Sequence, residues 1–123
     1  MGIATWCVLA AGVLPILSIA PAKVNPGFDN HAPREWLSRL SGWRQRAVWA
    51  QMNGWEAFPF FAAGVILAQA AQVPQGRVDA LALGFIAARL GYVACYYADR
   101  ATLRSVAWSA GFLCSVALYV LAA

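Results

Sequence analysis

Two ionisable residues lie inside stretches of sequence that are otherwise apolar. Glu56 falls within the run of residues 47–73, and Arg89 falls within the run of residues 78–98. A charge inside hydrocarbon costs about 3 kcal/mol or more, so such residues usually pair with each other and mark a functional site. The polar residues at helical spacing from them are Asn53, Tyr92 and Tyr96. We therefore expect the chemistry of the chain to be concentrated here.

The composition places these residues in a membrane protein. Of the 123 residues, 62% are hydrophobic and only 11% are charged, which excludes a soluble domain with a polar surface. Four apolar runs each approach the roughly 20 residues that a helix needs to cross a bilayer. They predict helices over residues 3–22, 47–73, 78–98 and 103–121. The runs are continuously apolar, which excludes the alternating strands of a membrane barrel. We therefore predict an all-α, integral membrane four-helix bundle, with residues 1–123 as one domain.

The first apolar run has an alternative interpretation as a cleaved signal peptide. Residues 20–22, Ala-Pro-Ala, resemble the small-residue end of such a peptide. However, no basic residue precedes the run, and the run is longer than a usual signal core. We therefore expect it to be retained as the first membrane helix.

Positive charge predicts the orientation, because Lys and Arg are enriched in cytoplasmic loops. Near the second connection only Arg77 is basic, whereas the first and third connections and their flanks carry Lys23, Arg34, Arg39, Arg44, Arg46, Arg100 and Arg104. We therefore expect the loops 23–46 and 99–102 to be cytoplasmic and both termini to face the opposite side. The lipid bilayer is the expected partner, and the absence of a nucleic-acid motif argues against a nucleic-acid partner.

The cysteines suggest neither a metal site nor a disulfide framework. Cys7, Cys95 and Cys114 all lie in apolar runs, their number is odd, and none of them forms a CxxC pair. Metal sites and disulfide frameworks show paired, characteristic spacings. We therefore expect no metal ligand in this chain.

Helical geometry arranges the polar residues in two stripes. With about 100 degrees per residue, Arg46, Trp49, Asn53, Glu56 and Phe60 share one face of the second predicted helix, and Arg89, Tyr92, Tyr96 and Arg100 share one face of the third. A rise of about 1.5 Å per residue places Glu56 and Arg89 at a similar depth in the two antiparallel helices. The same rise places Asn53 at the depth of Tyr92 and Trp49 at the depth of Tyr96. We expect a polar crevice that opens toward the cytoplasm, with its two walls from one chain or from two.

The same residues resemble a known family. The segment from Ala50 to Pro59, with Asn-x-x-Glu-x-x-Pro, and the segment from Ala88 to Tyr96, with Arg-x-x-Tyr-x-x-x-Tyr, look like the MAPEG family of membrane-associated proteins in eicosanoid and glutathione metabolism. Residues 102–105 look like a bacterial branch of it. The resemblance implies a homotrimer of four-helix protomers, here in a bacterial inner membrane, with glutathione bound between neighbouring protomers. It also implies a transferase or peroxidase activity on lipophilic small molecules.

The resemblance also implies roles for individual residues. Gln51, Asn53, Glu56, Tyr92 and Tyr96 would hold glutathione, and Arg89 belongs to the same polar cluster. Arg104 would be the catalytic residue, because a nearby guanidinium stabilises a thiolate. Two positions depart from the family pattern: Trp49 stands where glutathione-using members have an arginine, and Ala57 where several have a tyrosine. Arg46, on the same stripe as Trp49, could replace the missing arginine, and so could Lys23 from the loop.

A non-catalytic alternative remains open at this point. A buried network around Glu56 and Arg89 could only fix the packing of the helices, as satisfied polar groups do in membrane bundles. The protein would then be a structural or accessory subunit of a membrane complex. Its basic loop, with Trp36 and Trp43, would lie on anionic lipid headgroups. A transporter is less favoured, because four short helices show no internal repeat.

Overall fold

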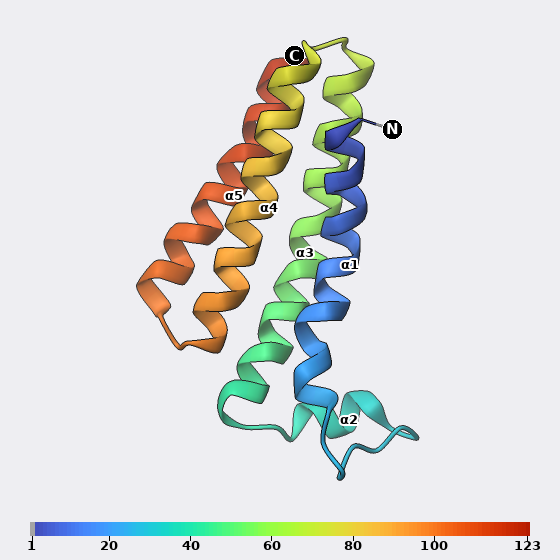
Figure 1. Cartoon of the computed structure of the whole chain (residues 1–123), viewed down its shortest axis with the longest axis vertical. Coiled ribbons are helices and arrows are strands. Elements are labelled where there is room, and N and C mark those ends of the chain that lie inside the picture. The colour runs from blue at the N-terminus through green and yellow to red at the C-terminus, as the bar shows by residue number, and fades with distance from the viewer. Residues whose placement is uncertain (1) are drawn as a thin grey trace.

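The computed structural model describes residues 2–123 and is entirely helical, with no β-strand in that range. Four long helices stand side by side, and a short one lies across one end (Figure 1). The bounds are Ile3–Lys23 for α1, Pro33–Ser38 for α2, Gly42–Ala70 for α3, Gln75–Tyr97 for α4 and Ala101–Ala122 for α5. The all-α prediction is confirmed. The four-helix prediction is not confirmed, because the described residues form five helices: four long ones and α2, which lies in a segment expected to be a loop.

Three of the long helices, α1, α4 and α5, are long and apolar enough to cross a membrane. The sequence interpretation expected four such helices. With 29 residues α3 is the longest helix, but its first half carries Arg44, Arg46, Asn53 and Glu56. This polar half lowers the hydropathy of α3 below that of the helices that qualify as membrane spans.

The chain termini and the basic segments lie at opposite ends of the bundle. Both chain termini lie at the end where α3 turns into α4, whereas α2 and the short α4–α5 turn lie at the opposite end (Figure 1). The basic residues of the segments 23–46 and 99–104 therefore gather at one end of the bundle. The count of Lys and Arg predicted that both of these basic segments lie on the same side of the membrane, which requires them to be at the same end of the bundle. The side of the membrane on which this end lies stays a prediction.

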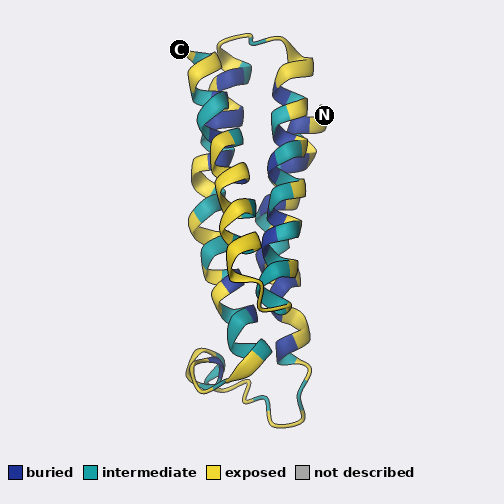
Figure 2. Cartoon of the chain, turned by 90° about the vertical axis from the view of Figure 1, so that its left-hand side faces the viewer, coloured by how far each residue is buried: buried dark blue, intermediate teal, exposed yellow. Residues whose placement is uncertain are grey.

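The apolar core runs along the space between the four long helices. Buried residues face this space, and exposed residues cover the outside of the bundle (Figure 2). In the main core Phe61 of α3 stacks on Phe85 of α4, and Leu118 of α5 is fully buried with them. A second cluster, built on Ile19 and Leu37, packs α2 against the ends of α1 and α3. The many exposed apolar side chains on the outside suit a surface that faces lipid.

Small residues let the helices approach each other closely. A Cβ atom added to Gly54 on α3 would lie 2.8 Å from Cγ of Pro15 on α1, and one added to Gly64 would lie 3.1 Å from Cε2 of Tyr119 on α5. A side chain at position 54 would therefore clash with Pro15, and one at position 64 would force Tyr119 to shift by a few tenths of an ångström. The expected use of small residues at helix interfaces applies to these positions.

Arg46 links the N-terminal part of α3 to the last turn of α4. Its Nε donates to the backbone carbonyl of Tyr96 at 2.8 Å, and its Nη2 donates to that of Tyr97 at 3.3 Å. These carbonyls belong to the last turn of α4, where a cation is also favoured by the helix dipole. These two bonds hold the last turn of α4 against α3.

Candidate functional site

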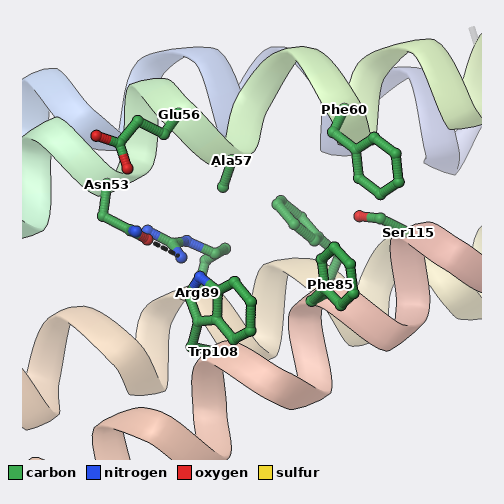
Figure 3. Close-up of a pocket in the computed structure, with 9 residues that line it drawn as sticks. Asn53, Glu56, Ala57, Phe60, Phe85, Arg89, Trp108 and Ser115 are labelled. Carbon is green, nitrogen blue, oxygen red and sulfur yellow. Dashed lines mark hydrogen bonds between the residues drawn. The ribbon is translucent and has the colours of Figure 1, made fainter.

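Two neighbouring cavities lie on the face where α3, α4 and α5 meet. The first, which we call the Arg89 cavity, has a volume of about 200 Å³ (Figure 3). It is lined by Asn53, Glu56, Ala57, Phe60, Phe85, Arg89, Trp108, Phe112 and Ser115. The second, which we call the Arg104 cavity, has a volume of about 250 Å³ and is lined by Tyr92, Tyr96, Arg104, Ser105, Trp108 and Ser109. Trp108 borders both cavities, so they adjoin each other.

Arg89 is the most deeply buried charge, with only 4% of its surface exposed. Its Nη1 donates to Oδ1 of Asn53 at 2.8 Å, and its Cζ lies 4.1 Å from the centre of the Tyr92 ring. The hydrogen bond and the cation–π contact partly offset the cost of burying the guanidinium. Its Nη2 is also buried and has no hydrogen-bond partner among residues 2–123. A buried donor without a partner is costly, so a ligand atom that accepts from Nη2 would bind favourably.

The expected ion pair between Glu56 and Arg89 does not form. Within residues 2–123 the single ion pair joins Glu35 to Arg39, on the short helix α2. Asn53, and not Glu56, is the partner of Arg89, because Asn53 is half-buried on the side of α3 that meets the buried Arg89, whereas the side chain of Glu56 is exposed. Glu56 is exposed, and it lines the same cavity as Arg89 (Figure 3). Its carboxylate is therefore available to a cationic group of a ligand.

Arg104 lies at the mouth of the second cavity, in the first turn of α5. Its Cζ is 4.4 Å from the centre of the Tyr96 ring, and Tyr96 meets Tyr92 edge-on with ring centres 5.3 Å apart. No carboxylate pairs with Arg104 among the described residues. The guanidinium therefore presents free donors to a cavity that also contains tyrosine and serine hydroxyls.

Trp49, which stands in place of the family's arginine, packs beside the same cavity. The centres of the Trp49 and Tyr96 rings are 6.4 Å apart, as the predicted rung between these residues requires. Trp49 thus supports the position of Tyr96 but supplies no positive charge. Arg46, one of the two possible substitutes, borders neither cavity, because its Nε and Nη2 bond the last turn of α4.

Gln51 lies apart from the other predicted site residues. It lines a third cavity of about 690 Å³ between α2 and α3, together with Lys23, Arg34 and Trp49. The structure therefore brings Asn53, Glu56, Arg89, Tyr92, Tyr96 and Arg104 to one face of the protomer, and it leaves Gln51 and Arg46 outside the two adjoining cavities.

Apart from Arg104, the residues of α5 that line the cavities were missed by the sequence interpretation. Trp108 and Phe112 follow Arg104 at intervals of four residues, so they lie on the same face of the helix. This spacing was a signal that could have found them. The spacing was not used because uncharged aromatic residues are common in membrane helices and so do not by themselves indicate a site.

The fold defines an all-helical integral membrane protein with polar cavities between its helices. The comparison with protein-family models agrees with this class, since the model of the MAPEG family matches residues 3–123, essentially the whole chain. The chain belongs to the MAPEG family. No curated protein and no solved structure shows significant similarity to it.

Proposed function

We propose that this MAPEG-family protein is a glutathione-dependent transferase or peroxidase that acts on lipophilic electrophiles. The observation that carries the proposal is the unpaired guanidinium of Arg104 in a cavity lined by hydroxyl groups. A positive charge beside a thiol favours the thiolate, which is the nucleophilic form. Electrostatic stabilisation by Arg104 would then be sufficient for catalysis, without a covalent intermediate on the protein.

The adjoining Arg89 cavity has groups that complement the polar ends of glutathione. The carboxylate of Glu56 has no cationic partner among residues 2–123 and suits the ammonium group of the γ-glutamyl end. The side-chain NH₂ group of Asn53 remains free to donate to a ligand carbonyl, because only its Oδ1 is bonded to Arg89. Glutathione would then extend from Glu56 toward Arg104, with Tyr92 and Tyr96 between them.

We further propose that the site is completed by a second protomer of a homotrimer. The family resemblance implies glutathione between protomers, and the placement of Gln51 supports this arrangement. Gln51 faces a separate cavity that also holds Lys23 and Arg34. If this cavity met the Arg104 cavity of a neighbour, Gln51 would reach the ligand and the two cations would replace the charge that Trp49 does not supply.

The proposed location is a bacterial inner membrane, with the loops 23–46 and 99–102 in the cytoplasm. The basic residues gather at the end of the bundle that holds these loops. The Arg104 cavity lies near the same end, because Arg104 is in the first turn of α5. Glutathione would therefore enter from the cytoplasm, and the lipophilic partner from the bilayer.

A non-catalytic accessory subunit is the second candidate. It is favoured by the contacts of Arg89, which hold α4 to α3 without any ligand. In that case the network would serve helix packing alone.

Calorimetric titration of the purified protein in detergent with glutathione separates the two candidates. We expect heat release that is lost in Arg104→Ala and Glu56→Gln. It should survive in Arg77→Ala, which removes an exposed arginine at the other end of the bundle. A folded protein that releases no heat with glutathione would exclude the transferase and favour the accessory role.

A further inference from the structure

Two residues of α3 that line neither the Arg89 cavity nor the Arg104 cavity both contact Tyr96. They are Arg46 and Trp49, which lie about one turn apart on the helix. The Nε of Arg46 donates to the backbone carbonyl of Tyr96 at 2.8 Å. The Trp49 ring packs beside the Tyr96 ring, with centres 6.4 Å apart and planes 48° apart. One turn of α3 therefore holds both the main chain and the side chain of the same residue.

Tyr96 in turn holds the guanidinium of Arg104. The Cζ of Arg104 lies 4.4 Å from the centre of the Tyr96 ring, and no carboxylate among residues 2–123 pairs with this arginine. An arginine side chain has many rotamers, and a cation–π contact favours those that keep the guanidinium over the ring. The direction in which Arg104 points therefore depends on where the Tyr96 ring lies.

The Tyr96 ring needs support from outside its own helix. Tyr96 is only partly buried, so the apolar core does not enclose its ring. Tyr92, one turn earlier on α4, meets the ring edge-on with centres 5.3 Å apart. Trp49 contacts it from α3, and Arg104 contacts it from α5. The ring thus joins three helices at the end of the bundle where α3 begins and α4 ends (Figure 1).

The charges of the two α3 residues suit this supporting role. Trp49 is neutral, so it holds the ring without placing a second positive charge beside Arg104. The positive charge of Arg46 is directed to the carbonyls of Tyr96 and Tyr97 in the last turn of α4, where the helix dipole favours a cation. Arg104 therefore remains the cation that faces the cavity and its ligand.

We propose that Arg46 and Trp49 are positioning residues that act through Tyr96 to hold the guanidinium of Arg104 at the Arg104 cavity. Their role rests on the proposed function of Arg104 and deepens it, because it specifies what orients this side chain. Neither residue lines the cavity, so neither is a catalytic residue. When the Tyr96 ring is released, Arg104 should spend less time beside the sulfur of bound glutathione.

The first test measures the thiolate absorbance per molecule of bound glutathione in the detergent-solubilised protein. At about pH 6.5, roughly two units below the pKa of a free thiol, Trp49→Leu should lower this yield roughly three-fold, which is the factor expected for a partly exposed cation–π contact. At about pH 9.5 the thiol ionises without help, so the variant and the wild type should agree. A merely structural defect would not follow pH in this way.

Three further variants complete this test. Trp49→Phe keeps an aromatic ring and should restore most of the yield, whereas Arg46→Gln should lower it as Trp49→Leu does. Arg46→Gln also carries the test if Trp49→Leu does not fold. Trp6→Leu, which removes an exposed tryptophan of α1, is the control and should keep the wild-type yield. A variant of Trp49 or Arg46 that binds less glutathione but keeps a normal yield per bound molecule would overturn the positioning role.

The second test needs no glutathione and separates this role from the proposed function. With ¹⁵N-labelled arginine, the side-chain resonance of Arg104 is assigned by its loss in Arg104→Ala. The ring current of Tyr96 should shift this resonance, and the shift should shrink at least two-fold in Trp49→Leu and in Arg46→Gln. A shift that both variants leave unchanged would overturn the positioning role. A shift that responds as expected, in a protein that forms no glutathione thiolate, would overturn the transferase and leave the contacts of Tyr96 standing.

Discussion

The hydrogen bond between Asn53 and Arg89 should be a measurable source of stability. A hydrogen bond to a charged group contributes about 1.5–3 kcal/mol in soluble proteins, whereas side-chain hydrogen bonds in a membrane bundle average about 0.6 kcal/mol and reach about 1.7. Arg89 is only 4% exposed and its Nη2 already lacks a partner. Asn53→Ala would leave Nη1 unpaired as well. We therefore expect a coupling free energy near the upper membrane value, about 1.5 kcal/mol.

A double-mutant cycle measures this coupling directly. The variants are Asn53→Ala, Arg89→Met and the two combined, and the assay is reversible unfolding by sodium dodecyl sulfate in mixed micelles, followed by far-ultraviolet circular dichroism. Gln69→Ala is the matched control, because Gln69 is a partly buried amide on α3 whose side chain makes no hydrogen bond with the described residues. A coupling below about 0.5 kcal/mol, which is within the usual error of additivity, would refute the account of Arg89.

Two further predictions concern the packing of α3. Gly54→Ala would place a methyl group 2.8 Å from Pro15, so it should lower the free energy of unfolding by about 1–3 kcal/mol in the same assay. Gly76→Ala meets nothing within 4 Å and is its control; equal effects of the two would contradict the close approach of α1 and α3. Arg46→Gln should remove the bonds to the last turn of α4 and speed hydrogen exchange at the α4–α5 turn. Arg100→Gln, an exposed arginine in that turn, should not, and unchanged exchange in Arg46→Gln would argue against the capping role.

The sequence predicted the long helices well, because the length of an apolar run is set by the bilayer. The observed α1 and α4 end within a residue or so of expectation, since Lys23 and Asp99 follow the apolar stretches. The start of α3 was misplaced because residues 42–46 are helical but polar, so the hydropathy pattern did not include them. The short helix α2 was missed for a similar reason, as six residues carry too little periodicity to detect.

The site was predicted in its residues better than in its pairings. The helical stripe placed Asn53 and Glu56 on one face of α3, because positions about one turn apart share a face, and the structure brings both to the cavity that Arg89 of α4 lines. The pairing of Glu56 with Arg89 was wrong, because it depended on the axial register between two helices. Counts of residues fix that register only to within about one turn, and Asn53 lies three residues from Glu56, so the counts could not decide which of the two meets Arg89.

The central claim is that Arg104 stabilises a glutathione thiolate. The most direct measurement is the ultraviolet absorbance of the thiolate when glutathione is added to the purified protein at about pH 6.5, roughly two units below the pKa of about 8.5 of a free cysteine thiol. The account predicts a thiolate signal that grows with bound glutathione, persists in Arg77→Ala and disappears in Arg104→Ala. Bound glutathione without a thiolate signal, or a signal of equal size in Arg104→Ala, would contradict it.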